Sequence, residues 1–121
     1  MIYFIRSKGG IVMEATTPKE FFEKVLPARF DPSKAAGVDA VVQLNITGDN
    51  GGDWYIIIKD QKLEVKTGIH QNPVITAKMK DTDYVDMVNG KITGDKAYMT
   101  GKLRFKGNIS VGMKLKGLGI L

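Results

Sequence analysis

Cysteine is absent from this chain, and histidine occurs once, at His70. Without a thiol the chain has no disulfide framework, no thiolate metal site and no thiol nucleophile. A single histidine leaves little for a zinc site or for a Ser-His-acid triad, and we predict that His70 lies exposed in a loop. We therefore expect no metal, no other cofactor and no catalytic residue.

Long apolar runs are also missing. No stretch approaches the roughly 20 consecutive apolar residues that span a bilayer, and the run at residues 2–5 is too short and too early for a signal peptide. The printed sequence ends in Gly-Ile-Leu and not in the Ser-Lys-Leu peroxisomal address. We expect a cytoplasmic protein.

The totals fit one globular domain. The chain has 121 residues, of which 43% are hydrophobic and 26% charged, which is enough to build a single core. Its net charge of +5 favours anionic partners, and composition alone does not choose between lipid headgroups, phosphorylated ligands and nucleic acid.

Residues 1–15 do not match the pattern of the rest. We predict an N-terminal extension there and a domain over residues 16–121. One interpretation is a native start at Met13, because Lys8-Gly9-Gly10 can be encoded by codons that resemble a ribosome-binding site. The other is a short extra strand at the edge of the sheet.

Helix and strand patterns divide residues 16–121 into a clear order. Thr17-Pro18-Lys19-Glu20 matches a capping box, so a helix begins there, and a second helical turn follows Asp31. Alternation then predicts strands over 40–47, 54–59, 63–67 and 74–79, the first with Gln43 on a polar, solvent-facing side. Two helices start near 81–82 and 93, before a strand at 102–106 and a final short helix.

The acidic residues at the start of the third helix are a weak candidate for catalysis. Asp81, Asp83 and Asp86 cluster as an acid–base pair would require, but acids in the first turn of a helix more often serve as caps and as partners of the helix dipole. The Gly-Lys pairs at 90–91 and 101–102 lack the spacing of a phosphate-binding loop, and we reject them.

The strand at 102–106 is basic on one side and apolar on the other. Lys102, Arg104 and Lys106 alternate with Leu103 and Phe105. Nucleic acid is a poor match, because Phe105 faces away from the basic row and the chain holds 13 acidic residues against 18 basic ones. We expect no nucleic-acid partner.

Adaptable apolar side chains gather in the second half of the chain. They are Met79, Met87, Met99, Met113, Tyr84, Tyr98 and Phe105, and an uncharged apolar end follows at 118–121. Methionine fills irregular space, which suits either a core or a cavity for flexible chains. Patterning alone leaves both interpretations open.

Several segments together resemble the sterol carrier protein 2 family of lipid-binding domains. They are Gly90-Lys91, Lys96-Ala97-Tyr98-Met99, the strand Gly101-Lys102-Leu103-Arg104-Phe105-Lys106-Gly107, Gly112-Met113-Lys114-Leu115, and Trp54 at the start of the second strand. The resemblance covers about residues 18–118. Gly112 departs from it, since alanine is common at that place in the final helix.

The resemblance implies an α+β fold: a five-stranded, mainly antiparallel sheet with about five short helices on one face and an apolar tunnel between sheet and helices. It implies non-enzymatic binding, and transfer or presentation, of a lipid, a sterol-like molecule or a fatty acyl chain such as an acyl-CoA. The expected ligand-binding residues are Trp54, Met79, Tyr84, Met87, Val88, Tyr98, Met99, Leu103, Phe105, Met113, Leu115 and Leu118.

Basic side chains are expected to steer anionic headgroups or membranes. They are Lys102, Arg104, Lys106 and Lys114, with Lys116 as a further candidate. The expected partners are a lipid, a membrane in transient contact and a lipid-metabolising enzyme, for a monomer or weak dimer. The alternative is a structural or interaction module that uses its apolar C-terminal segment to contact a partner or another copy.

Overall fold

A computed structural model describes residues 2–7 and 10–121 of the chain, with side chains from Glu14 onward. Its centre is one five-stranded sheet in the order β5-β4-β3-β6-β7. The strands are β3 (Ala40–Thr47), β4 (Gly52–Lys59), β5 (Lys62–Thr67), β6 (Ile75–Lys80) and β7 (Leu103–Gly107).

The sheet is mixed and mostly antiparallel. Strands β3, β4 and β5 form the meander that the alternating pattern predicts, and β7 pairs antiparallel with β6. Only β3 and β6 run parallel, because the chain returns from the outer strand β5 to the far side of β3 before β6 begins. The predicted α+β class and mainly antiparallel sheet are confirmed.

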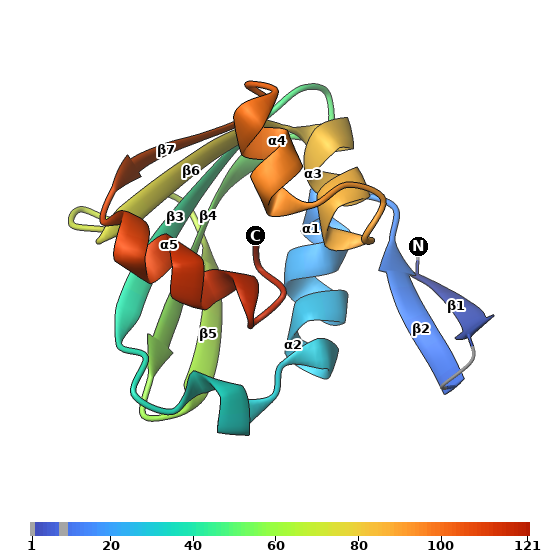
Figure 1. Ribbon diagram of the computed structural model, residues 1–121, viewed down its shortest axis with the longest axis horizontal. Coiled ribbons are helices and arrows are strands. Elements are labelled where there is room, and N and C mark those ends of the chain that lie inside the picture. The colour runs from blue at the N-terminus through green and yellow to red at the C-terminus, as the bar shows by residue number, and fades with distance from the viewer. Residues whose placement is uncertain (1, 8–9) are drawn as a thin grey trace.

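Helices cover one face of this sheet (Figure 1). One continuous helical segment comprises α1 (Pro18–Glu20), η1 (Phe21–Val25) and α2 (Leu26–Arg29), and the others are η2 (Pro32–Ala35), α3 (Asp81–Val88), α4 (Gly94–Met99) and α5 (Ile109–Lys116). The count is therefore four helical segments and one 3-10 turn, against the five short helices expected. The short turn η2 accounts for the difference.

The predicted helix starts are set by side chains that cap free backbone amides. Thr17 Oγ1 accepts from Glu20 N at 3.1 Å. Glu20 Oε1 accepts from Thr16 N at 3.0 Å, which is a capping box with the return bond shifted to the residue before the N-cap. The start of α3 differs from the prediction. Lys80 holds the N-cap position without a side-chain bond, and Asp81 is already helical.

The core lies between the sheet and the helices. Phe22 packs against Trp54 with ring centroids 4.9 Å apart and stacks on Tyr84 at 5.4 Å. The prediction that Gln43 faces solvent on a polar side of β3 is wrong, because only 2% of its surface is exposed. Its amide donates to carbonyl oxygens of Trp54 and Gly68, so the loop after β5 covers it.

Residues 2–7 and 10–15 form a separate hairpin, β1 (Ile2–Ser7) and β2 (Gly10–Ala15), which projects from the domain (Figure 1). Its strands pair with each other in a sheet of their own, so β1 and β2 are not strands of the main sheet's edge as the second interpretation of residues 1–15 supposed. Asn89 fixes the end of β2 through two hydrogen bonds to the backbone of Ala15. Lys8 and Gly9, on which the predicted start at Met13 depends, lie outside the described residues, and the division at residue 15 stays a prediction.

Candidate functional site

A largely apolar cavity of about 200 Å³ opens between β6, β7, α4 and α5. Its walls combine side chains from both layers: Ile75, Gly94, Asp95, Tyr98, Leu103, Phe105, Ile109, Gly112, Met113, Lys116 and Leu121. Alternation on β7 turns Leu103 and Phe105 toward the helices, which is why these two belong to the wall. The tunnel expected at this place stays a prediction.

Gly112 explains how closely α5 approaches the sheet. A Cβ at this position would lie 3.0 Å from Cδ1 of Ile75 on β6, so the glycine makes room for that side chain at the cavity wall. The residue is buried, and Leu115, one turn further on, is fully buried. The departure from alanine thus serves the packing of α5, at a cost of up to about 1 kcal/mol in helix propensity.

An ion pair joins the two helices beside the cavity. Lys116 Nζ on α5 lies 2.7 Å from Asp95 Oδ1 and 2.9 Å from Oδ2 on α4. Both residues line the cavity, and both are substantially exposed to water. They therefore stand at its opening, where they supply the two charged groups of an otherwise apolar wall.

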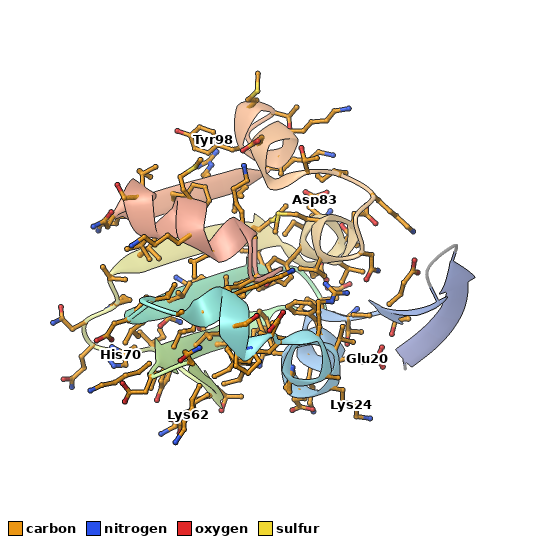
Figure 2. The ribbon with its side chains drawn as sticks, turned by 60° about the horizontal axis from the view of Figure 1, so that its bottom comes forward. Glu20, Lys24, Lys62, His70, Asp83 and Tyr98 are labelled. Atoms are coloured by element: carbon orange, nitrogen blue, oxygen red, sulfur yellow. The ribbon has the colours of Figure 1, made fainter. Side chains whose placement is uncertain are left out.

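Large apolar side chains at the opening are unusually exposed. Tyr98, Ile109 and Met113 line the cavity yet are 56%, 54% and 60% exposed, and Met99 beside Tyr98 is 83% exposed. Tyr98 stacks on Phe105 with centroids 5.7 Å apart, and Figure 2 shows it projecting from α4 toward the side that holds α5 and β7. These residues form a rim and not a closed roof.

The C-terminal segment lies inside the molecule, between α5 and the helix of α1 and α2 (Figure 1). Ile120 is fully buried and Leu118 is 5% exposed. The Oη of Tyr84 donates a hydrogen bond of 2.8 Å to the carbonyl oxygen of Ile120, and Leu121 completes the cavity wall. The apolar end therefore packs into its own domain.

Burial of Tyr84 affects its titration. Removal from water raises the pKa of the phenol well above its ordinary value, and the positive charge of Arg29 opposes this only in part. Desolvation likewise lowers the pKa of Arg29, whose guanidinium donates to the carbonyl oxygen of Val88 at 2.9 Å. Tyr84 thus keeps its proton and stays a donor to Ile120.

The predicted ligand-binding residues fall into three groups. Four line the cavity: Tyr98, Leu103, Phe105 and Met113. Six are buried in the core: Met79, Tyr84, Met87, Val88, Leu115 and Leu118. The remaining two are Trp54, which is buried beside a different groove, and Met99, which is exposed next to the opening.

That second groove lies between the helical segment η1–α2 and the strands β4 and β5, at the β5 edge of the sheet. It holds about 660 Å³ and is lined by Phe22, Glu23, Pro27, Trp54, Tyr55, Leu63, Val65, Lys66 and Thr67. The Nε1 of Trp54 is buried without a hydrogen-bond partner among the described residues. The groove is more polar and more open than the cavity, which lies at the opposite edge of the same helix-covered face of the sheet.

The predicted steering residues lie on several surfaces. Arg104 and Lys106 point to the open face of the sheet, opposite the cavity, where they are exposed and stand across from Lys78 and Thr76. Lys102 pairs with Asp83 at 3.8 Å, and Lys114 is exposed on α5. All belong to β7, the turn before it, or α5, the elements next to the cavity.

Three cavity residues, Ile75, Asp95 and Ile109, are absent from the predicted ligand-binding residues. Ile75 belongs to a strand that reads as ordinary core, and Asp95 reads as a residue in the first turn of a helix. One signal was available for Ile109: Ile109 and Met113 stand four residues apart, hence on one side of α5.

Two of the three acids considered for catalysis, Asp81 and Asp83, have structural partners. Asp81 Oδ2 accepts from Asn50 N at 2.9 Å and Oδ1 from Thr82 N at 2.8 Å, while Asp83 faces Lys102. No group of three His, Cys, Asp or Glu side chains suited to a metal occurs in the described part of the chain. Within that part, too, every helix is too short or too polar to cross a bilayer.

Known proteins are similar to this chain in sequence. "Hydroxysteroid dehydrogenase-like protein 2" of Mus musculus is 35% identical over 80 residues, which cover 65% of this chain and 16% of that protein. The protein of the same name from Xenopus tropicalis is 23% identical over 114 residues, or 93% of this chain and 27% of that protein. The chain thus spans a small part of these relatives.

Solved structures of sterol carrier proteins have a similar fold. Palmitated SCP2L2 from Aedes aegypti superposes with a TM-score of 0.69 at 26% identity, covering 83% of this chain and 92% of that one. Sterol Carrier Protein 2 from Yarrowia lipolytica, in its apo form, gives 0.63 at 20% identity, with 83% and 81% covered. The family model described as the SCP-2 sterol transfer family matches residues 22–119. With most of its length matched, the chain belongs to the SCP-2 sterol transfer family.

Proposed function

We propose that this protein binds the acyl chain of a lipid or fatty acid non-covalently in the cavity between β6–β7 and α4–α5, and carries or presents it in the cytoplasm without catalysis. The single observation that carries the proposal is the composition of the wall, which is apolar apart from one ion pair at the opening. Such walls hold hydrocarbon, and a few polar groups at the opening orient the ligand. Membership of a lipid-carrier family supports the same function.

The volume of the cavity limits the length of acyl chain that it accommodates without a conformational change. If a methylene takes roughly the 30 Å³ of a water molecule in the liquid, 200 Å³ accommodates about six methylenes. At about 0.8 kcal/mol each, they contribute roughly 5 kcal/mol, less than the roughly 8 kcal/mol of a micromolar complex. A long chain therefore requires more room, and movement of Leu121 and its neighbours in the C-terminal segment would supply it.

The charged pair at the opening favours an anionic ligand. A fatty carboxylate that emerges beside Lys116 would replace Asp95 as its partner, whereas an uncharged headgroup would leave the existing pair intact. The palmitated relative from Aedes aegypti supports a fatty acid as a ligand of this fold. We infer that fatty acids or other acyl chains with an anionic head are the preferred class.

Displacement of a fluorescent fatty-acyl probe by unlabelled lipids tests the proposal. Gly112→Phe places a bulky ring at the cavity wall next to Ile75, and Gly117→Phe places the same ring outside it, at the exposed end of α5. We expect saturable binding for the wild type and Gly117→Phe and a loss of at least tenfold for Gly112→Phe, with circular dichroism to verify the fold. Equal binding by both variants, or none by folded wild type, contradicts the proposal.

An interaction module is the competing function, and the C-terminal segment is what would mediate it. Burial of Leu118 and Ile120 inside the domain weighs against this use, because those side chains are not available to a partner. Light scattering discriminates between the two: loss of an oligomer on removal of residues 118–121 supports the module, and unchanged mass with altered probe binding supports the carrier. The named relatives also suggest a lipid-metabolising enzyme as the recipient of the ligand.

A further inference from the structure

The exposed apolar side chains of the domain are concentrated at one place. Five large hydrophobic residues are exposed among those described with side chains, and four of them, Tyr98, Met99, Ile109 and Met113, stand at the ends and outer sides of α4 and α5. We call these four residues the apolar lip. The fifth, Ile69, lies in the loop between β5 and β6 and is 71% exposed.

Packing of the domain does not account for the lip. On α5 the buried positions are Gly112 and Leu115, which face the sheet, while Ile109 and Met113 lie one turn apart and are more than half exposed. Met99 does not border the cavity and is 83% exposed. Exposed apolar side chains concentrated at one place on a monomer indicate an interaction surface.

The positive charge of the protein lies in the same part of the chain. Residues 87–121 carry seven basic side chains and one acidic one, Asp95, whereas residues 1–86 carry eleven basic and twelve acidic ones. The seven are Lys91, Lys96, Lys102, Arg104, Lys106, Lys114 and Lys116. The whole net charge of +5 therefore originates in α4, β7, α5 and their connections.

Position in the fold brings the charge and the lip together. Strand β7 is one of the two edge strands, so Arg104 and Lys106 lie at the same edge of the sheet as α5, although on the opposite, open face. Lys96 shares α4 with Tyr98 and Met99, and Lys114 shares α5 with Met113. Exposed apolar side chains among lysines match a surface that inserts shallowly between anionic headgroups.

We propose that the apolar lip docks the protein on an anionic lipid bilayer, with Tyr98, Met99, Ile109 and Met113 inserted at the headgroup level and the neighbouring Lys96 and Lys114 on the phosphates. This docking turns the opening of the cavity toward the membrane, and in that respect it rests on the proposed function. An acyl chain then passes between bilayer and cavity without crossing water.

Single-cysteine variants test the docking, because the chain contains no cysteine of its own. Met99→Cys and Ile69→Cys each receive an environment-sensitive fluorophore and are mixed with vesicles of phosphatidylcholine alone or of equimolar phosphatidylcholine and phosphatidylserine. We expect a blue shift at position 99 with the anionic vesicles only, weakened by salt, and none at position 69. Equal shifts at both positions, or no shift at either, overturn the proposal.

A second pair of variants measures the energetic importance of the lip. Met99→Glu and Ile69→Glu make the same change of charge at two exposed positions, of which only the first is in the lip. We expect sedimentation with anionic vesicles to fall on the order of tenfold for Met99→Glu and less than twofold for Ile69→Glu. Equal losses point to general electrostatics and overturn the docking.

The fatty-acyl probe separates this inference from the proposed function. Met99 was expected among the ligand-binding residues, but it does not line the cavity and is 83% exposed. Both glutamate variants should therefore bind the probe as the wild type does. Vesicle binding without probe binding would refute the carrier function and leave the docking intact. Probe binding without vesicle binding would do the reverse, and selective binding of the lip to nucleic acid or to an acidic protein would replace the bilayer as the partner.

Discussion

The phenol of Tyr84 on α3 donates a 2.8 Å hydrogen bond to the carbonyl oxygen of Ile120, 36 residues further along the chain. Both residues are fully buried. This bond holds the C-terminal segment inside the domain, next to the cavity that Leu121 helps to line. The end of the chain is thus connected both to the stability of the core and to the volume available for a ligand.

Tyr84→Phe should lower the free energy of unfolding by about 1–3 kcal/mol, because it leaves the buried carbonyl of Ile120 without a donor. Urea denaturation measures the loss, and hydrogen exchange should show faster exchange at residues 118–121. Tyr98→Phe is the control, since Tyr98 is 56% exposed and its variant should stay within about 0.5 kcal/mol of the wild type. A similar loss for both variants would contradict the importance of this bond.

Leu121→Ala should shift binding toward longer acyl chains, because it removes part of the cavity wall that limits chain length. Probe displacement by a series of fatty acids of increasing length measures this as the length at which affinity stops rising. Val111→Ala is the matched control, being half-buried on α5 but absent from the wall. If the profile of the Leu121 variant coincides with the wild type, the C-terminal segment does not limit the ligand.

Asp95→Asn should tighten binding of a long-chain fatty acid several-fold while it leaves the matching fatty alcohol unchanged. Loss of the carboxylate frees Lys116 for the ligand's own negative charge. The stability cost should stay within about 1 kcal/mol, since the pair is exposed. Lys116→Gln should weaken binding of the fatty acid and leave binding of the fatty alcohol unchanged. If the affinities for acid and alcohol change in parallel in either variant, the pair has no role in recognition.

The stabilising contribution of the Asp81 carboxylate should be lost in acid. Hydrogen bonds from the backbone amides of Asn50 and Thr82 lower the pKa of its carboxyl group below the ordinary 3.8. Its stabilisation is therefore complete above that value and is lost as the pH falls through the lower pKa of the folded state. Melting temperatures of the wild type should exceed those of Asp81→Asn from neutral pH down to about pH 4 and converge below it.

The control is Asp49→Asn, an exposed aspartate next to Asn50 in the turn that donates to Asp81. Because this side chain is exposed, the melting temperature of the variant at neutral pH should match that of the wild type. The carboxylate of Asp81 also occupies the place where a Cβ at Gly48 would lie, and Gly48 has a φ of +100°. Gly48→Ala should therefore destabilise the protein at neutral pH, and a neutral result would show that the turn is not held against Asp81.

Local patterns determined a large part of this protein. The capping box at Thr17 and Glu20 appears in the sequence because both partners lie within one helical turn. Alternation predicted the meander, and the segments around Lys102–Gly107 identified the family whose model the chain matches. These features depend on neighbours in sequence, which is why the sequence alone reveals them.

Tertiary structure decided the rest. Gln43 reads as solvent-facing, yet the loop that follows β5 buries it and satisfies its amide. The ion pair of Asp95 and Lys116 joins residues 21 apart, and the burial of Ile120 depends on Tyr84 of a distant helix. Whether an apolar residue becomes core, cavity wall or exposed lip depends on which elements pack around it, and that is a property of the whole fold and not of the residue's type or spacing.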